Sequence, residues 1–193
     1  DQYSVVREKH LHIETTNNFP HGTGIASSAA GFGALALCIS ELEEEFTNGE
    51  YKHSLENASK IARLGSGSAC RSLFGKPAIW GKHESFELSS DEYAIEFEDE
   101  IAFPLNQLND AVLIIDAGEK TVSSTEGHGL LTGNPYAEAR YKSATANLAK
   151  ITDAFRKGNV HHFIHIVESE ALQLHAMMML SNPYYILMRP GTL

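Results

Sequence analysis

The sequence is poor in cysteine and in basic residues, and each shortage excludes a class of protein. Cys38 and Cys70 are the two cysteines among 193 residues, which is too few for a disulfide framework. Because both stand among apolar or small residues, we expect reduced, buried thiols. The 15 lysines and arginines are outnumbered by 25 acidic residues, giving a formal net charge of −10. This charge is a poor match to nucleic acid or to an anionic membrane, so we expect neither as a partner.

Long apolar runs are also missing from the sequence. None approaches the roughly 20 residues that span a bilayer, and the first residues lack a signal-peptide pattern. A cytoplasmic protein is therefore expected. Hydrophobic residues make up 42% of the chain and charged residues 21%, which predicts a folded core. Neither end resembles a terminal element, so the chain is expected to be an internal fragment.

The polarity pattern of the first half predicts two helices and several short strands. Residues 11–15 alternate between apolar and polar, as in a strand. From Ala26 onward, apolar residues recur at helical spacing. The acidic run 43–45 should end this helix and lie in solvent. The residues predicted to form its buried stripe are Phe32, Leu35, Ala36, Ile39 and Leu42.

A shorter helix should follow, with Ser54 as its N-cap and Gly65 at its end. Ser66 then begins another short helical stretch that includes Arg71. Residues 78–80 and 93–97 are predicted as strands, because apolar and β-favouring residues dominate them.

The second half should contain a buried strand and a helical hairpin. Residues 110–116 form a continuous apolar run, as in a strand covered on both faces. A boundary just before it predicts domains at 1–108 and 109–193. One helix should start at Asn134-Pro135 and end at Gly158, and a second should start at Asn159.

The Gly- and Ser-rich segment 20–30 lies between the first predicted strand and helix, where a phosphate can bind. Gly22 and Gly24 let a bulky anion approach the backbone. Ser27 and Ser28 can donate hydrogen bonds or contact Mg²⁺, and the helix N-terminus adds a partial positive charge. Neither the Walker A pattern nor G-x-G-x-x-G is present. The alternative is a glycine turn before an alanine-rich helix.

Two further polar segments are candidates for anion binding. In 65–72, two serines precede Arg71, whose planar guanidinium suits a carboxylate or phosphate; alternatively, Ser66 only caps a helix and Arg71 is a surface charge. In 120–127, a lysine and hydroxyl groups follow the predicted strand and suit a diphosphate. A plain surface loop is the alternative there. His161 and His165, one helical turn apart, are a weaker alternative as zinc ligands, because no third ligand is evident.

Together these segments resemble the diphosphomevalonate decarboxylases of the GHMP kinase superfamily. The similarity covers essentially the whole chain, and the segments that carry it are 17–32, 63–72, 120–127 and 174–178. The run Arg-Leu-Gly-Ser-Gly-Ser-Ala-Cys-Arg-Ser at 63–72 is the most specific, since it distinguishes the decarboxylases from the kinases. The resemblance implies an α+β fold of GHMP kinase type. Its N-terminal part would be like ribosomal protein S5 domain 2 and its C-terminal part ferredoxin-like, both incomplete.

The resemblance also implies a reaction in isoprenoid biosynthesis. ATP would phosphorylate the tertiary hydroxyl of mevalonate 5-diphosphate, and loss of phosphate and CO₂ would give isopentenyl diphosphate. ATP and Mg²⁺ are the implied cofactors, mevalonate 5-diphosphate the implied partner, and a homodimer is left open. The implied cofactor-binding residues are Gly22, Gly24, Ala26, Ser27 and Ser28, with Ser28 also at the metal. The implied substrate-binding residues are Ser66, Gly67, Ser68, Arg71, Lys120, Ser123 and Ser124, with Arg71 catalytic at the carboxylate.

One departure from the family pattern limits the expected activity. The family's catalytic aspartate lies in an Asp-Ala-Gly-Pro-Asn type segment near the C-terminus. Asp116-Ala-Gly-Glu-Lys resembles it but stands elsewhere and lacks Pro-Asn. The family's N-terminal segment with a strand and a lysine is also absent. We therefore predict that this polypeptide alone does not decarboxylate. A related enzyme acting on another mevalonate phosphate, a kinase that stops at phosphorylation, and a non-catalytic nucleotide-binding module are the alternatives.

Overall fold

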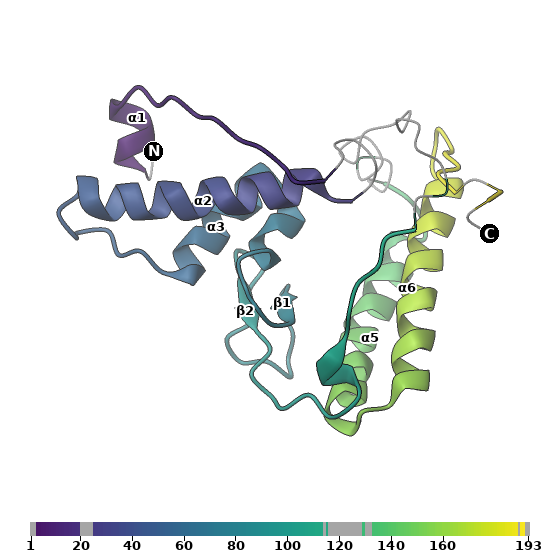
Figure 1. The fold of residues 1–193 in the computed structure, drawn as a ribbon. Helices are drawn as coiled ribbons and strands as arrows, with labels where there is room; N and C mark the ends of the chain where they lie inside the picture. The colour runs from purple at the N-terminus through teal and green to yellow at the C-terminus, as the bar shows by residue number, and fades with distance from the viewer. Residues whose placement is uncertain are drawn as a thin grey trace. The chain divides into compact units, whose positions relative to one another are not determined.

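The computed structural model describes residues 3–19, 25–113, 115, 129, 133–188 and 190–191. The chain divides into two compact units, Asp1–Glu98 and Asp99–Leu193, and Figure 1 shows the helices and the small sheet that compose them. Helices with a short sheet make the fold α+β. None of the described helices is long and apolar enough to cross a membrane.

The first unit is organised around the long helix α2, Ser27–Phe46. Helix α3, Leu55–Gly65, and the 3-10 helix η1, Gly67–Arg71, pack against it. The core between them consists of small side chains: Ala29, Ala36, Ala62 and Ala69. Small residues allow the helix backbones to come close together, so this contact depends on shape more than on apolar area.

The predicted helix at α2 is confirmed, but its predicted buried stripe is only partly right: Ala36 is buried and Leu35 and Ile39 are half-buried. Phe32 and Leu42 are 39% and 41% exposed. The buried side instead consists of Ala29, Gly33, Ala36, Ser40 and Glu43. A Cβ atom on Gly33 would lie 3.4 Å from the Cβ of Ser72. Because η1 approaches α2 this closely, small residues face it, and the larger apolar residues stay partly exposed.

The acidic run 43–45 is not entirely in solvent, contrary to the prediction. Helix α1, Ser4–Glu8, lies on α2, and Glu43 is only 2% exposed. The Glu43 carboxylate accepts hydrogen bonds from the backbone N–H groups of Ser4 and Val5, both at 2.7 Å, and from the Ser4 hydroxyl. Glu43 therefore caps α1 from another helix, which a local sequence pattern does not reveal.

Local signals correctly predicted the rest of the first unit, with one exception. Ser54 is the N-cap of α3 and accepts a hydrogen bond from the Asn57 N–H at 3.1 Å. Strands β1, Ala78–Trp80, and β2, Ala94–Glu96, pair antiparallel with Ile79 opposite Ile95. The exception is the strand predicted at 11–15. These residues are exposed and form no strand, because no described segment pairs with them.

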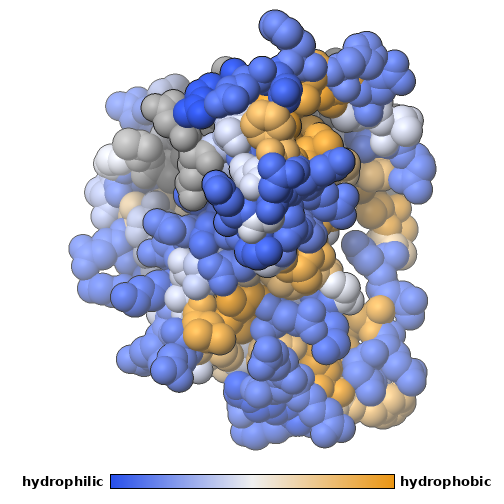
Figure 2. All heavy atoms as spheres, turned by 90° about the vertical axis from the view of Figure 1, so that its left-hand side faces the viewer, coloured by the Kyte–Doolittle hydropathy of each residue, from blue (hydrophilic) through white to orange (hydrophobic). Residues whose placement is uncertain are grey.

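The second unit is a helical hairpin made of α5, Ala137–Lys157, and α6, Val160–Met179. The turn is as predicted: Gly158 adopts a left-handed conformation with φ 63°, and the Asn159 side chain caps α6. Between the helices, the Glu170 carboxylate accepts hydrogen bonds from Arg140 at 2.6 Å and from Asn147 at 2.7 Å. Part of α6 is apolar and exposed. Figure 2, which turns the left-hand side of Figure 1 to the viewer, shows apolar side chains in patches among hydrophilic ones.

The two compact units divide before residue 99, whereas the predicted boundary lay between residues 108 and 109. Segment 99–105 leads into a 3-10 helix, η2 (Leu105–Gln107), and packs on the end of α5. The Ala102 N–H donates to the Phe155 carbonyl at 2.9 Å, and Arg156 donates to Asp99 at 2.6 Å. These bonds place the segment with the hairpin. The assignment of 1–108 and 109–193 as GHMP-type domains stays a prediction.

The buried strand predicted at 110–116 is wrong for the residues that the structure describes. Residues 110–113 form no strand, and Leu113 is 82% exposed. A continuous apolar run becomes a buried strand only when neighbouring strands pair with it and other elements cover both of its faces. The described residues provide no strand that pairs with 110–113.

Gly158 offers a test of the hairpin geometry. Its φ is positive, and an added Cβ would lie 2.2 Å from the Phe103 carbonyl oxygen. We expect Gly158→Ala to lower the free energy of unfolding by about 2 kcal/mol, from backbone strain and displacement of segment 99–105. Urea denaturation measures this. Gly75→Ala is the matched control, because its Cβ would meet nothing within 4 Å. An equal loss of stability in both variants would contradict a role for the close contact between Gly158 and Phe103.

Candidate functional site

The N-terminus of α2 carries the described part of the predicted phosphate loop. Ala26 is the N-cap in a left-handed conformation, φ 58° and ψ 41°, and no side chain among the described residues caps the helix. Its carbonyl accepts hydrogen bonds from the N–H groups of Ala29 and Ala30. The N–H groups of Ser27 and Ser28 precede these bonds and have no acceptor among the residues that the structure describes. Together with the partial positive charge of the helix end, they can bind an anion.

The other predicted residues of this loop, Gly22 and Gly24, lie outside the described residues, as do Lys120, Ser123 and Ser124 of the third segment. Ser28 is exposed and Ser27 is half-buried. For the metal, the Ser28 hydroxyl is one oxygen ligand of the kind Mg²⁺ accepts alongside nucleotide phosphates and water. Within the described ranges, no group of three His, Cys, Asp or Glu side chains could hold a metal ion. The alternative zinc site at His161 and His165 therefore gains no support.

The second predicted segment forms η1 and its N-cap, Ser66. As at α2, no described side chain caps this helix. Ser66 and Gly67 are half-buried, while Ser68 and Arg71 are exposed. In the part of the chain that the structure describes, Arg71 forms no ion pair. An exposed guanidinium without a carboxylate partner can bind an incoming anion without first breaking a salt bridge.

Aromatic rings pack against the two glycines that flank Ser66, Gly65 and Gly67. A Cβ on Gly65 would lie 2.2 Å from Cδ1 of Phe32, and a Cβ on Gly67 would lie 3.0 Å from Cη2 of Trp80. The Trp80 ring is itself held, because its Nε1–H donates to the Asp91 carbonyl at 3.0 Å. Glycine at both positions therefore lets η1 lie close beneath these rings.

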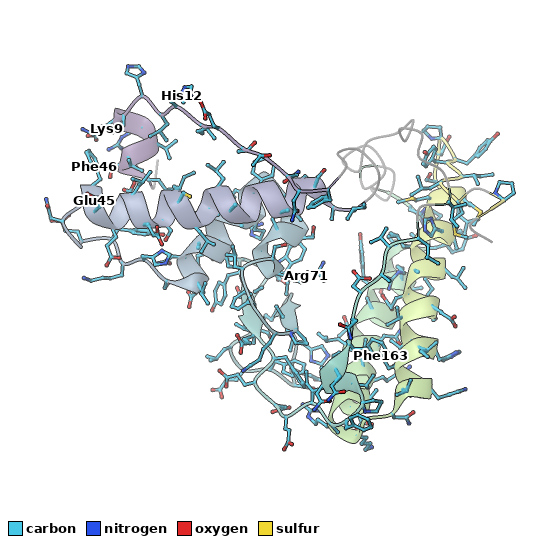
Figure 3. The ribbon with its side chains drawn as sticks, in the orientation of Figure 1. Lys9, His12, Glu45, Phe46, Arg71 and Phe163 are labelled. Atoms are coloured by element: carbon cyan, nitrogen blue, oxygen red, sulfur yellow. The ribbon has the colours of Figure 1, made fainter. Side chains whose placement is uncertain are left out.

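The fold brings the two predicted anion segments together. Ala29, one residue after Ser28, and Ala69, two residues before Arg71, belong to the same packed core. Figure 3 shows Arg71 beside the N-terminal half of α2. The start of α2 and the end of η1 are thus neighbours within the first unit, as a site for two anionic ligands requires.

The two cysteines differ in their surroundings. Cys70, within η1, is buried, and Cys38 is exposed, so the prediction of two buried thiols is half wrong. Burial raises the pKa of the Cys70 thiol, although the nearby guanidinium groups of Arg71 and Arg63 act in the opposite direction. The same two cations therefore lie close enough to the Cys70 thiol to act on it.

Sequence similarity bears on this site directly. Residues 1–94 match the family model described as "Diphosphomevalonate decarboxylase-like N-terminal domain". The diphosphomevalonate decarboxylase of Ganoderma lucidum is 34% identical over 175 residues, which cover 90% of this chain. The chain is a homologue of the diphosphomevalonate decarboxylases. The Saccharomyces cerevisiae diphosphomevalonate decarboxylase is 44% identical over 119 residues, or 61% of this chain.

Solved structures of diphosphomevalonate decarboxylases agree with this relationship. The mevalonate diphosphate decarboxylase of Legionella pneumophila matches with a TM-score of 0.71 and 28% identity over 91% of this chain. The complex of MDDEF with MVAPP, AMPPCP and magnesium matches with a TM-score of 0.69 and 27% identity over 90%. The matched region spans 42% of the Ganoderma lucidum protein and 27% of the Saccharomyces cerevisiae protein. It covers about half of each of the two solved chains.

Sequence reasoning missed the residues that hold η1 in place. Ser59 of α3 is fully buried, donates to the Cys70 carbonyl and accepts from the Ala94 N–H, both at 2.9 Å. The one available indication was a serine beside Ala58 and one turn before Ala62 and Arg63, on an alanine-rich face. That pattern shows a buried hydroxyl but not its partners, because both partners lie on other elements.

Proposed function

We propose that this chain forms the ATP- and substrate-binding portion of an enzyme that decarboxylates mevalonate 5-diphosphate to isopentenyl diphosphate. The observation that carries the proposal is that, among the residues the structure describes, a helix N-terminus without a side-chain cap lies next to an arginine without an ion-pair partner. A single anion would need only one of these features. ATP and a substrate that is both a carboxylate and a diphosphate use both.

In this proposal the start of α2 binds the phosphates of ATP. The N–H groups of Ser27 and Ser28 point along the helix axis, where the helix dipole favours negative charge. The Ser28 hydroxyl would help to hold Mg²⁺, which would supply positive charge against the charge that develops during phosphoryl transfer. The solved MDDEF complex with MVAPP, AMPPCP and magnesium supports a nucleotide, a metal and a substrate bound together.

Arg71 binds the substrate carboxylate, with Ser66, Gly67 and Ser68 donating hydrogen bonds beside it. After the tertiary hydroxyl is phosphorylated, the phosphate leaves and the C–C bond to the carboxylate breaks. The electron pair of that bond forms the new alkene, and the carboxylate departs as neutral CO₂. A preorganised guanidinium fixes the carboxylate in position for this step. Lys120, Ser123 and Ser124 are proposed to contact the diphosphate.

Several finer features belong to the same proposal. The first unit would be part of an S5 domain 2-like domain and the second part of a ferredoxin-like domain, together of GHMP kinase type. The protein would be cytoplasmic, and a homodimer is left open. The whole reaction needs a catalytic aspartate, and the family's Asp-Ala-Gly-Pro-Asn segment does not occur in these 193 residues.

We therefore expect the 193-residue chain to bind both ligands without turnover. Calorimetric titration with mevalonate 5-diphosphate, and separately with AMPPCP and Mg²⁺, should show saturable binding of each. With ATP in place of AMPPCP, neither CO₂ nor isopentenyl diphosphate should appear. Absence of binding would refute the proposal, and production of isopentenyl diphosphate would refute the predicted inactivity. Accumulation of a phosphorylated acid, or tighter binding of mevalonate 5-phosphate, would favour the alternative enzymes.

A further inference from the structure

Ser59 connects three elements of the first unit through one hydroxyl group. It lies on α3, its Oγ–H donates to the Cys70 carbonyl of η1, and its Oγ accepts the N–H of Ala94 at the start of β2. The exposed fractions of Ser59, Cys70 and Ala94 are 0%, 0% and 1%. Water therefore has no access to replace either bond.

We infer that Ser59 is a positioning residue for Arg71, holding the peptide group from which the arginine extends. This inference rests on the proposed function, in which Arg71 binds the substrate carboxylate. Ser59 is buried and has no contact with the substrate, so its effect must pass through the backbone of η1.

Peptide geometry supplies the connection. The carbonyl of Cys70 and the N–H and Cα of Arg71 belong to one planar peptide group. Anchoring the carbonyl oxygen at 2.9 Å therefore orients the plane that carries Arg71. Arg71 is the last residue of η1, so no later residue of this short helix restrains it.

A second bond from α3 fixes the other end of the connection. Arg63 lies one helical turn after Ser59 on α3, and its Nε–H donates to the Glu92 carbonyl at 2.9 Å. The two side chains thus hold both ends of the segment 92–94 against α3. Ser59 therefore links η1 to a restrained segment, which makes the anchor rigid.

Removal of the hydroxyl should separate the two ligands of the proposed site. In Ser59→Ala, the Cys70 carbonyl and the Ala94 N–H lose their partner, so the end of η1 can shift. A small displacement of a binding group is enough to weaken its contacts strongly. The start of α2 has no bond to Ser59, so nucleotide binding should not change.

Ser40→Ala is the matched control. Ser40 is also 0% exposed and hydrogen-bonds Tyr51 and His53 rather than any residue of η1. Ser59→Cys is a second variant of nearly the same size, with a weaker donor and acceptor; it keeps the test possible if the alanine variant does not fold. Circular dichroism identifies the temperature range in which every variant is folded.

The experiment measures dissociation constants of the 193-residue chain for mevalonate 5-diphosphate and for AMPPCP with Mg²⁺. We expect Ser59→Ala to weaken mevalonate 5-diphosphate binding roughly tenfold, with little change for AMPPCP, and Ser59→Cys to weaken it less. In an Arg71→Ala background the effect of Ser59→Ala should disappear. Equal weakening of both ligands, the same loss in Ser40→Ala, or no loss at all would overturn the inference. If the unsubstituted chain binds neither ligand, the proposed function itself fails, and the inference fails with it.

Discussion

Arg71→Ala should weaken binding of mevalonate 5-diphosphate by about 100-fold, which corresponds to about 3 kcal/mol. The guanidinium is proposed to make two parallel hydrogen bonds to the substrate carboxylate, and alanine makes neither. Binding of AMPPCP with Mg²⁺ at the start of α2 should be nearly unchanged. Calorimetric titration of the 193-residue chain with each ligand measures the difference.

The surroundings of Arg71 make this substitution easy to interpret. The side chain is exposed and has no ion-pair partner among the described residues, so its removal leaves no buried charge behind. The thermal midpoint should therefore stay within about 1 °C of the parent value, consistent with the small effect of most surface substitutions.

Two variants sharpen the test. Arg71→Lys keeps the charge but lacks the planar guanidinium. Its affinity for mevalonate 5-diphosphate should therefore lie between those of the parent chain and of Arg71→Ala. Arg7→Ala removes an exposed arginine of α1 that pairs with Glu8 at 2.8 Å, and its affinity should match the parent. Unchanged affinity in Arg71→Ala would show that the substrate carboxylate binds elsewhere.

Glu43→Ala should lower the free energy of unfolding by about 3 kcal/mol and release α1 from α2. The substitution removes the acceptor for two backbone N–H groups and a hydroxyl at the start of α1. Val5, 5% exposed, then loses its partner in a buried setting. Faster tryptic cleavage after Arg7 and Lys9 should accompany the loss of stability.

Glu43 also makes the docking of α1 depend on pH. Burial raises the pKa of its carboxyl, but hydrogen bonds from Ser4 and Val5 and the charge of Arg7 outweigh burial and lower the pKa below the ordinary 4.5. The stabilisation is therefore present above pH 4.5 and is lost as the pH falls through the lower folded-state pKa. Glu43→Gln should remove this part of the pH dependence in urea denaturation between neutral and acidic pH.

Glu45→Ala is the control for Glu43. Glu45 is exposed in the same acidic run, so the change should stay within about 0.5 kcal/mol. Figure 3 shows Glu45 beside Phe46 and near α1. The Lys9 ammonium lies 4.5 Å from the Phe46 ring centroid, and neither substitution removes either of these two side chains. Equal losses of unfolding free energy in the two variants would mean that the negative charge of the run 43–45, rather than capping by Glu43, stabilises the packing of α1.

The failed predictions share a physical cause. Residues 11–15 and 110–113 have the composition of strands, but a strand forms only where a neighbour pairs with it, and the described residues provide none. For α2, the apolar residues have helical spacing, but which face is buried depends on what packs there. The close approach of η1 buries Gly33 beside the predicted Ala36, while Phe32 and Leu42 stay partly exposed.

The sequence by itself determined the features that depend on neighbouring residues. The Ser54 cap, the turn at Gly158, the starts and ends of most helices, and the similarity to diphosphomevalonate decarboxylases all follow from short segments. Only the tertiary structure decided that Glu43 caps α1, that the start of α2 lies beside η1, and that Ser59 anchors Arg71. The reason is range: caps and turns involve residues within four positions of each other, whereas these contacts join residues 11 to 40 positions apart.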